Sequence, residues 1–262
     1  MSHHSAELSE ALSRISTVPR LLVALDFDGT LAPTVDQPED ARANSVAIDA
    51  ILDLVTLPAT RVALVSGRAL DSLERVARVP RDVVLVGSHG AEFRIDGIDT
   101  GPELSAEERE VLSRLCDTIG DVASHYGGTM TEIKPAGCGL HSRLAAQDTA
   151  AAAEAHALRA VAGMLGGSLV SHRRGKDILE FTVRAADKGT ALTTLRERCD
   201  VSAVMFVGDD VTDEDAFAVL RDGDVGIKVG EGATAAQYRV PDTDAVADLL
   251  AHFVATRTST PA

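Results

Sequence analysis

The sequence predicts an α/β protein in which a parallel-sheet domain is interrupted by a smaller α+β lobe. Short apolar runs rich in Val and Leu alternate with segments of helical spacing in the first and last thirds of the chain. Strands that alternate with helices favour a parallel sheet, because a parallel neighbour needs a crossover connection. The middle of the chain has the pattern of an antiparallel sheet with its own helices. We therefore expect one domain inserted into another.

Five apolar runs are expected to be strands that are buried on both faces of the parallel sheet. The segments between them place apolar residues three or four positions apart, as one face of a helix requires. The expected strands are 21–25, 62–65, 83–86, 204–207 and 225–229, and the expected helices are 46–55, 70–76, 190–198, 214–220 and 244–254.

The inserted lobe is expected to cover residues 96–183, which leaves 1–95 and 184–262 for the parallel-sheet domain. An Ala-rich stretch within the lobe favours a helix, because Ala is the strongest helix former. The expected strands of the lobe are 130–134, 140–144, 169–172 and 178–183, and its expected helices are 105–119 and 146–164.

Composition excludes several functional classes. The chain of 262 residues has 40 acidic and 25 basic side chains, a formal charge of −15, which argues against nucleic-acid binding. Its longest uncharged runs, of about a dozen residues, are short of the ~20 that span a bilayer, so no membrane contact is expected. The first residues lack the pattern of a secretion signal, so we expect a cytoplasmic protein. The three cysteines lack CxxC spacing, which argues against a disulfide framework and a four-ligand zinc site. No protein partner is indicated.

The first candidate site follows the expected strand 21–25. Asp26 and Asp28 are spaced i and i+2, so strand periodicity would place both carboxylates on one side, and Gly29 lets the chain turn. Ligands of open parallel sheets bind beyond the carboxyl ends of the strands. An ordinary turn at the end of a strand is the alternative, whereas a calcium loop would need the rest of its twelve-residue pattern.

A second acidic cluster follows the expected strand 204–207. Thr212 and the acids 213–215 fit the first turn of a helix, where carboxylates interact favourably with the dipole. Asp209 and Asp210 precede that helix and would repel one another without a cation. Two acidic pairs at strand ends suggest a divalent cation with oxygen ligands, most naturally Mg²⁺. Solvated loop acids remain the alternative.

Two further positions suit a phosphate group. Ser66 and Gly67 follow the expected strand 62–65 and open a helix, which offers a hydroxyl and backbone N–H groups, although a Ser at this place is often only a cap. Lys188 lies at the start of another expected helix, where a cation is unfavourable with the dipole and therefore suggests an anion.

These motifs resemble the haloacid dehalogenase superfamily of phosphohydrolases, because Asp26 to Thr30, Ser66, Lys188 and Gly208 to Asp210 occur in that family's order. The resemblance implies a Rossmann-like core with an inserted α+β cap. In finer detail the chain is similar to trehalose-6-phosphate phosphatases, although the segment 181–187 lacks that family's usual Arg-Pro. That similarity implies substrate contacts by Arg68 and by the cap residues Glu132, Lys134, His141, Arg143, Lys176 and Glu180.

The resemblance also implies a reaction, the Mg²⁺-dependent hydrolysis of trehalose 6-phosphate to trehalose and phosphate through an aspartyl-phosphate. Asp26 would be the nucleophile and Asp28 the general acid and base, while Ser66 and Lys188 would hold the phosphoryl oxygens. The metal residues would be Asp26, Asp28 through its backbone carbonyl, Asp209 and Asp210, with Asp213 in a supporting role. The alternatives are another sugar phosphate, such as sucrose phosphate or a glycosyl phosphoglycerate, a mutase and a phosphate-sensing module.

Overall fold

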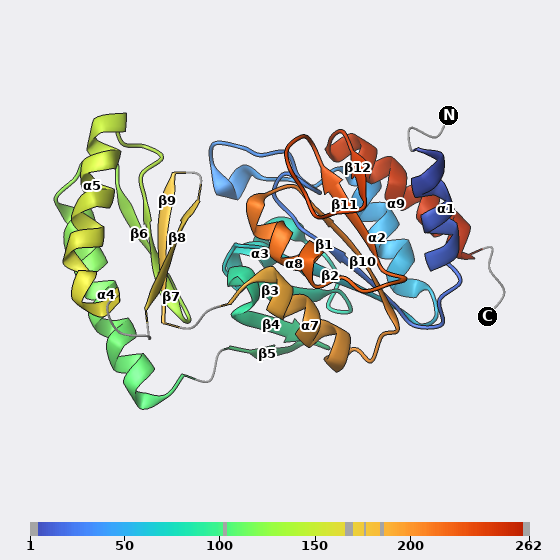
Figure 1. The fold of residues 1–262 in the computed structure, drawn as a ribbon, viewed down its shortest axis with the longest axis horizontal. Helices are drawn as coiled ribbons and strands as arrows, with labels where there is room; N and C mark the ends of the chain where they lie inside the picture. The colour runs from blue at the N-terminus through green and yellow to red at the C-terminus, as the bar shows by residue number, and fades with distance from the viewer. Residues whose placement is uncertain (1–4, 102–103, 166–169, 176, 184–185, 259–262) are drawn as a thin grey trace. The chain divides into compact units, whose positions relative to one another are not determined.

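The computed structural model describes residues 5–101, 104–165, 170–175, 177–183 and 186–258. The chain divides into two units (Figure 1). The core unit comprises Met1–Thr100 and Ala186–Ala262, and the cap unit comprises Gly101–Ala185. The core unit is therefore built from two segments that are far apart in the sequence, and the cap unit is inserted between them.

Among the described residues, the core unit contains an eight-stranded sheet with the order β12-β11-β10-β1-β2-β3-β4-β5 (Figure 1). The pairs from β12 to β3 are parallel, whereas β3–β4 and β4–β5 are antiparallel. The predicted parallel sheet is thus confirmed. The strands are β1 (Leu21–Leu25), β2 (Thr60–Val65), β3 (Val84–Gly87), β4 (Glu92–Ile95), β5 (Ile98–Thr100), β10 (Ala203–Gly208), β11 (Val225–Val229) and β12 (Tyr238–Val240).

Helices cover both faces of this sheet. One apolar layer joins the sheet to α1 (Ala6–Ile15), α2 (Ser45–Thr56), α3 (Leu70–Ala77) and α9 (Thr243–Thr258). The other layer joins it to α7 (Lys188–Arg198) and α8 (Glu214–Ala218). Short 3-10 turns, η1 (Pro38–Asp40), η2 (Ser88–Gly90) and η3 (Val211–Asp213), lie in the connections between these elements.

Strand β1 shows why the sequence reads as an unbroken apolar run. Leu21, Val23 and Leu25 pack into the layer of α2 and α9, while Leu22 and Ala24 pack into the layer of α7 and α8. All five side chains are fully buried. Because both faces of a central parallel strand are covered, neither face needs polar residues.

The described part of the cap unit contains a four-stranded antiparallel sheet with the order β6-β7-β9-β8. Helix α4 begins with a capping box, in which Ser105 and Glu108 exchange side-chain to backbone hydrogen bonds. Buried side chains of α4, α5 and the sheet form one apolar cluster. The elements are α4 (Ala106–Ser124), β6 (Met130–Lys134), β7 (Gly137–His141), α5 (Gln147–Ala160), α6 (Ala162–Leu165), β8 (Ser171–Gly175) and β9 (Ile178–Thr182).

Three predicted boundaries need correction. The lobe was expected to begin at residue 96, but β5 pairs with β4 in the core sheet, so 96–100 belong to the core unit. The strand expected at 140–144 lies at 137–141, and the helix expected at 146–164 is divided between α5 and α6. Part of the strand expected at 169–172 lies outside the described residues. No helix within the described ranges is both long and apolar enough to cross a membrane.

Candidate active site

Three neighbouring strands end at the same edge of the core sheet. Since β10, β1 and β2 are adjacent and parallel, the residues that follow them, Asp209, Asp26 and Ser66, leave the sheet side by side. Gly29 adopts φ +84°, and a Cβ atom there would lie 2.1 Å from the Asp209 Oδ2 atom. A glycine is therefore required where the loop after β1 passes the Asp209 carboxylate.

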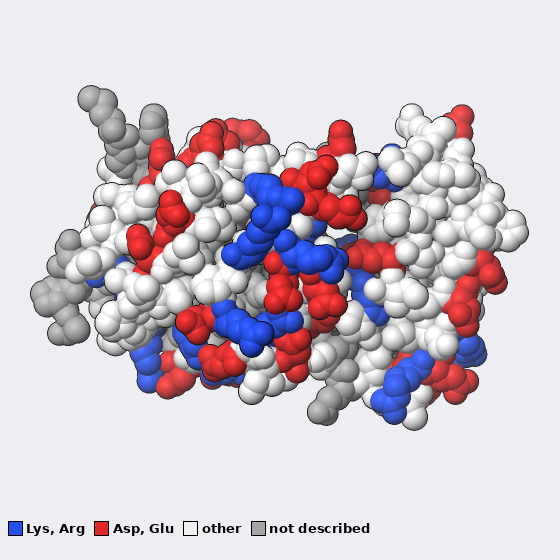
Figure 2. All heavy atoms as spheres, turned by 180° about the vertical axis from the view of Figure 1, so that it is seen from behind, with Lys and Arg blue, Asp and Glu red and all other residues white. Residues whose placement is uncertain are grey.

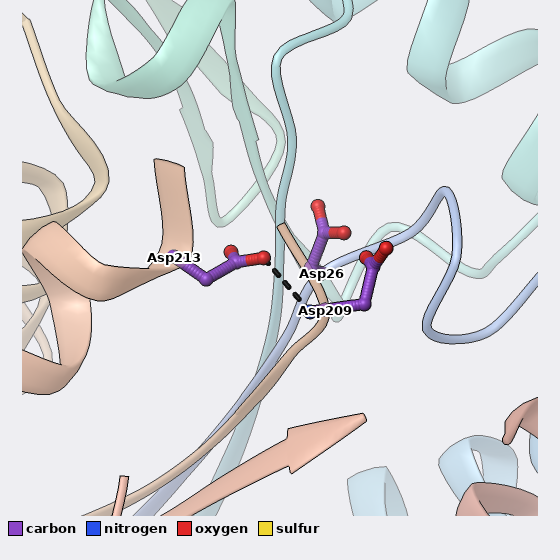
Figure 3. Close-up of side chains that lie close together, drawn as sticks. All are labelled: Asp26, Asp209 and Asp213. Atoms are coloured by element: carbon purple, nitrogen blue, oxygen red, sulfur yellow. Dashed lines mark hydrogen bonds between the residues drawn. The ribbon is translucent and has the colours of Figure 1, made fainter. Parts of the chain in front are cut away.

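Asp26, Asp209 and Asp213 form the acidic cluster of this edge. One carboxylate oxygen from each lies within 4.8 Å of the others, and in the view of Figure 3 the Asp26 carboxylate lies between those of Asp213 and Asp209. Asp26 and Asp213 are buried and Asp209 is half-buried. Asp28 was expected to contribute only its backbone carbonyl, and its side chain is not part of this cluster. Of the two further acids expected at or near the metal, Asp213 belongs to the cluster and Asp210 does not.

Lys188 connects two members of the acidic cluster. Its Nζ atom donates hydrogen bonds of 2.7 Å to both Asp26 Oδ1 and Asp213 Oδ1. The lysine is 2% exposed and is the first residue of α7, which Asp187 caps through the Thr190 N–H group. The Lys188 side chain therefore meets carboxylates at the position where the sequence suggested an anion.

Asp213 is held by more donors than the other two carboxylates of the cluster. Its Oδ2 atom accepts hydrogen bonds from the backbone N–H groups of Asp209, at 2.9 Å, and Asp210, at 2.8 Å. Its Oδ1 atom accepts from Lys188. Asp213 thus fixes the loop after β10 and the lysine together, and this favours a supporting role beside a cation over a primary one.

The electrostatics of the cluster fit a divalent cation. Three ionised carboxylates and Lys188 carry a formal charge of −3 + 1 = −2. Burial raises the pKa of Asp26 well above its usual value; Asp213 and Asp209 raise it further, and Lys188 opposes them. Burial and Asp213 also raise the pKa of Asp209. A hard cation with two positive charges would balance the cluster and would favour oxygen ligands.

Arg68 and Asp28 form a two-pronged ion pair beside the cluster. Arg68 Nε donates to Asp28 Oδ2 and Arg68 Nη2 donates to Asp28 Oδ1, each at 2.6 Å. Ser66, 1% exposed, accepts a hydrogen bond at Oγ from the Arg68 N–H group at 3.2 Å. The sequence assigned Arg68 to the substrate, whereas the structure joins it to Asp28.

The cap unit holds a second set of charged residues that the sequence predicted. Glu132 on β6 and Glu180 on β9 pair with Gly139 from the two sides of β7, and a Cβ at Gly139 would lie 2.8 Å from the Ile178 Cδ1 atom. Lys134 donates to Glu180 and lies 3.7 Å from Glu132, and His141 Nε2 lies 2.9 Å from Glu132 Oε2. These four side chains, the cap cluster, lie on the sheet face opposite the buried Leu140 and Leu179, whose layer includes α4 and α5.

Neighbouring side chains keep the Glu132 carboxylate of the cap cluster ionised. Burial alone would favour the protonated form of Glu132, but His141 and Lys134 outweigh burial and lower its pKa. Arg143 Nε lies 3.8 Å from the Asp177 carboxylate. Lys176 lies outside the described residues, so the structure does not place it.

Lys228 was missed by the sequence analysis. It lies on β11, is 4% exposed, and donates from Nζ to the backbone carbonyl of Asp209, while Glu214 Oε1 lies 3.8 Å from the same nitrogen. The available signal was a lysine inside an apolar run that was expected to be a buried strand. A buried lysine needs a partner, so its position pointed to an acidic or carbonyl oxygen nearby.

The family model described as trehalose-phosphatase matches residues 24–244 of this sequence. The chain belongs to the trehalose-phosphatase family. A trehalose-6-phosphate phosphatase of Escherichia coli K12 is 32% identical over 227 residues, which are 83% of this chain and 81% of that protein. A bifunctional trehalose-6-phosphate synthase/phosphatase of Thermoproteus tenax is 33% identical over 91% of this chain.

This member of the trehalose-phosphatase family spans only part of some relatives. It covers 32% of the Thermoproteus tenax protein and 65% of a Mycobacterium marinum trehalose-phosphate phosphatase. The crystal structure of a trehalose-6-phosphate phosphatase related protein has a TM-score of 0.73 and 27% identity, over 89% of this chain and 97% of that one. A haloacid dehalogenase-like hydrolase of Bacteroides thetaiotaomicron, with a TM-score of 0.63 and 16% identity, shares the fold. The predicted fold class is confirmed.

Proposed function

We propose that the chain hydrolyses trehalose 6-phosphate to trehalose and phosphate. The family model and the E. coli relative support the substrate. The observation that carries the proposal is the buried Asp26 carboxylate, which lies at the end of β1 with Lys188 on one oxygen and two more carboxylates within reach. Such a constellation suits attack on an anionic phosphoryl group once positive charge is added.

Asp26 is the proposed nucleophile. Its carboxylate forms a bond to phosphorus, the bond from phosphorus to the sugar oxygen breaks, and an aspartyl-phosphate results. Lys188 orients the nucleophile through the 2.7 Å bond to Oδ1 and offers its remaining proton to a phosphoryl oxygen. Ser66 follows the neighbouring strand, β2, and its hydroxyl donates to the same phosphoryl group. Its Oγ atom also accepts the hydrogen bond from the Arg68 N–H group, which shapes the loop beside that group.

Asp28 is the proposed general acid and base. It protonates the departing sugar oxygen and later takes a proton from the water that hydrolyses the aspartyl-phosphate. The side chain of Asp28 is 35% exposed, more than the 5% of Asp26, which suits a group that must reach both a substrate oxygen and a water molecule.

Asp26 and Asp209 are the side chains proposed to hold Mg²⁺, with the Asp28 backbone carbonyl, and with Asp213 and Asp210 in support. When bound, the ion reduces the repulsion between the nucleophile and the phosphate. Thr30 donates to the Asp209 Oδ1 atom at 3.2 Å, and Lys228 donates to the backbone carbonyl of Asp209. Both the side chain and the backbone of Asp209 are therefore held in place.

The cap cluster is proposed to recognise the sugar. Glu132, Lys134, His141 and Glu180 offer paired donors and acceptors on one sheet face, as the hydroxyls of a disaccharide require. Arg143 and Lys176 complete the proposed set. We expect no nucleic acid, membrane or protein partner. On the face drawn in Figure 2, the described Lys and Arg side chains lie among Asp and Glu side chains, which does not favour a phosphate backbone.

Phosphate release tests the proposal. Trehalose 6-phosphate, glucose 6-phosphate, sucrose 6-phosphate and glucosyl 3-phosphoglycerate are compared with Mg²⁺ and with EDTA. We expect Mg²⁺-dependent release from trehalose 6-phosphate, abolished by Asp26→Asn and kept by Asp222→Asn, a control at an exposed acid. Preference for another member of the panel would discard the proposed substrate, and release unaffected by Asp26→Asn would discard the nucleophile.

A further inference from the structure

We infer that Arg68 is a positioning residue, which orients the Asp28 carboxylate for proton transfer and does not bind the substrate. This inference rests on the proposed function. Its first support is the geometry of the ion pair. Two nitrogens of one guanidinium meet the two oxygens of one carboxylate at 2.6 Å each, and such a bidentate pair fixes the plane of the carboxylate as well as its position.

The guanidinium of Arg68 is itself held from other directions. Its Nη1 atom donates to the backbone carbonyl of Pro38 at 2.8 Å, and its Cζ atom lies 5.8 Å from the centre of the Phe27 ring. The side chain is 11% exposed. All three nitrogens of Arg68 therefore donate to the protein, through three of the five N–H groups of the guanidinium, and this holds the side chain against Asp28.

The backbone of Arg68 is fixed within the loop after β2, which also carries Ser66. Its N–H group donates to Ser66 Oγ at 3.2 Å, and its carbonyl accepts from the Ser88 N–H group at 2.7 Å. Ser88 has φ +49°, an uncommon conformation for a residue other than glycine, so the surrounding structure holds this turn in place. The loop that carries Ser66 thus also sets the direction of Asp28.

This arrangement has a chemical consequence. A carboxylate has about four lone-pair directions, and Arg68 occupies two of them. The other two stay available, in a fixed plane, to hold the proton that Asp28 gives to the sugar oxygen and later to accept a proton from water. Without the guanidinium, Asp28 would rotate freely about its side-chain torsions, and its oxygen would meet the leaving group only part of the time.

Leaving-group dependence separates this role from substrate binding. The sugar oxygen of trehalose 6-phosphate is a poor leaving group that needs a proton, whereas the nitrophenolate of p-nitrophenyl phosphate does not. The ratio kcat/KM reports only the steps up to loss of the leaving group. For Arg68→Lys and Arg68→Gln we expect kcat/KM to fall about 10- to 100-fold for trehalose 6-phosphate, through kcat, and less than about 3-fold for p-nitrophenyl phosphate.

Two controls accompany these variants. Arg61→Lys removes another two-pronged pair, in which Arg61 on β2 meets Asp96 at 2.8 and 3.2 Å, and should leave both substrates unaffected. Asp28→Asn should reproduce the selective loss. Arg68→Lys retains the positive charge and is expected to fold. If it loses activity on trehalose 6-phosphate as Arg68→Gln does, the two-pronged geometry of the guanidinium matters and not its charge alone.

Four results would overturn the role of Arg68. An equal loss on both substrates would show that Arg68 binds the phosphoryl group they share. A higher KM for trehalose 6-phosphate with unchanged kcat would make it a sugar contact. Full activity of Arg68→Lys would leave only a charge effect. If Asp28→Asn itself kept full kcat/KM on trehalose 6-phosphate, the proposed acid would be wrong, and the role of Arg68 would be lost with it.

Discussion

Replacement of Lys188 by methionine should destabilise the core unit strongly, because it leaves the Asp26 and Asp213 carboxylates buried without their cation. Lys188 is 2% exposed and bonds to both at 2.7 Å. Removal of one partner of a buried ion pair costs about 3–5 kcal/mol. For a domain of this size each kcal/mol lowers the melting temperature by about 2–4 °C, so we expect a decrease of about 6–20 °C in EDTA at neutral pH.

The same loss should depend on pH and on Mg²⁺. The pKa of Asp26 is already raised in the folded protein, and the loss of Lys188 raises it further. At low pH a carboxyl group with a raised folded pKa is protonated in both the folded and the unfolded protein, so its burial does not oppose folding. Stability is lost as the pH rises from about 4, where the unfolded group ionises, through the folded pKa. The deficit of Lys188→Met should therefore shrink at acidic pH, and Mg²⁺ should recover part of it at neutral pH.

Thermal denaturation of the wild type and Lys188→Met at several pH values, with Mg²⁺ or EDTA, measures this prediction. Arg196→Met is the matched control, because Arg196 lies on the same helix, is 9% exposed and pairs with the buried Asp224 away from the acidic cluster. Its deficit should not respond to Mg²⁺. A Lys188→Met protein as stable as the wild type at neutral pH in EDTA would refute the reasoning.

Three further predictions concern the cluster and the cap. Gly29→Ala should weaken Mg²⁺ binding, measured by thermal shift, because its Cβ would displace Asp209. The control Gly97→Ala adds a Cβ at φ +76° in open space and should only lower stability by about 1–2 kcal/mol. Equal Mg²⁺ affinity in both variants would contradict the close contact at Gly29. Millimolar Mg²⁺ should raise the melting temperature of the wild type, and no shift would count against a metal at the acidic cluster. Glu180→Gln, which removes one of the two charged partners of Lys134, should raise KM for trehalose 6-phosphate about tenfold and leave p-nitrophenyl phosphate unaffected. Unchanged sugar selectivity would remove the cap cluster from recognition.

The core of the fold could be predicted from the sequence because its strands are continuous apolar runs. Strands β1 and β11 lie at their predicted bounds, since each is buried on both faces. Strand β7 was misplaced by three residues because two of its positions are glycines, which show no apolar alternation. At Gly137 a Cβ would lie 2.2 Å from the Phe181 carbonyl oxygen, so close approach of the strands, and not hydrophobicity, selects the residue.

The site was predicted less evenly than the strands. Asp26, Asp209 and Lys188 follow from strand ends and a helix start, which the sequence marks. Asp213 has the pattern of a residue in the first turn of a helix, and only the bend after β10 shows that its carboxylate turns back to the strand end. The partner of Arg68 depends on the lateral distance between loops after β1 and β2, which no local pattern encodes.

The central claim is that Asp26 carries the phosphoryl group during turnover. Trehalose 6-phosphate labelled in its phosphate is mixed with the protein and Mg²⁺, the reaction is quenched with acid within milliseconds, and the peptide that contains Asp26 is analysed for label. We predict label on Asp26 in the wild type and, after longer reaction times, in Asp28→Asn, where both formation and hydrolysis of the intermediate are slow. Its absence from both, while phosphate is still released, would contradict the account.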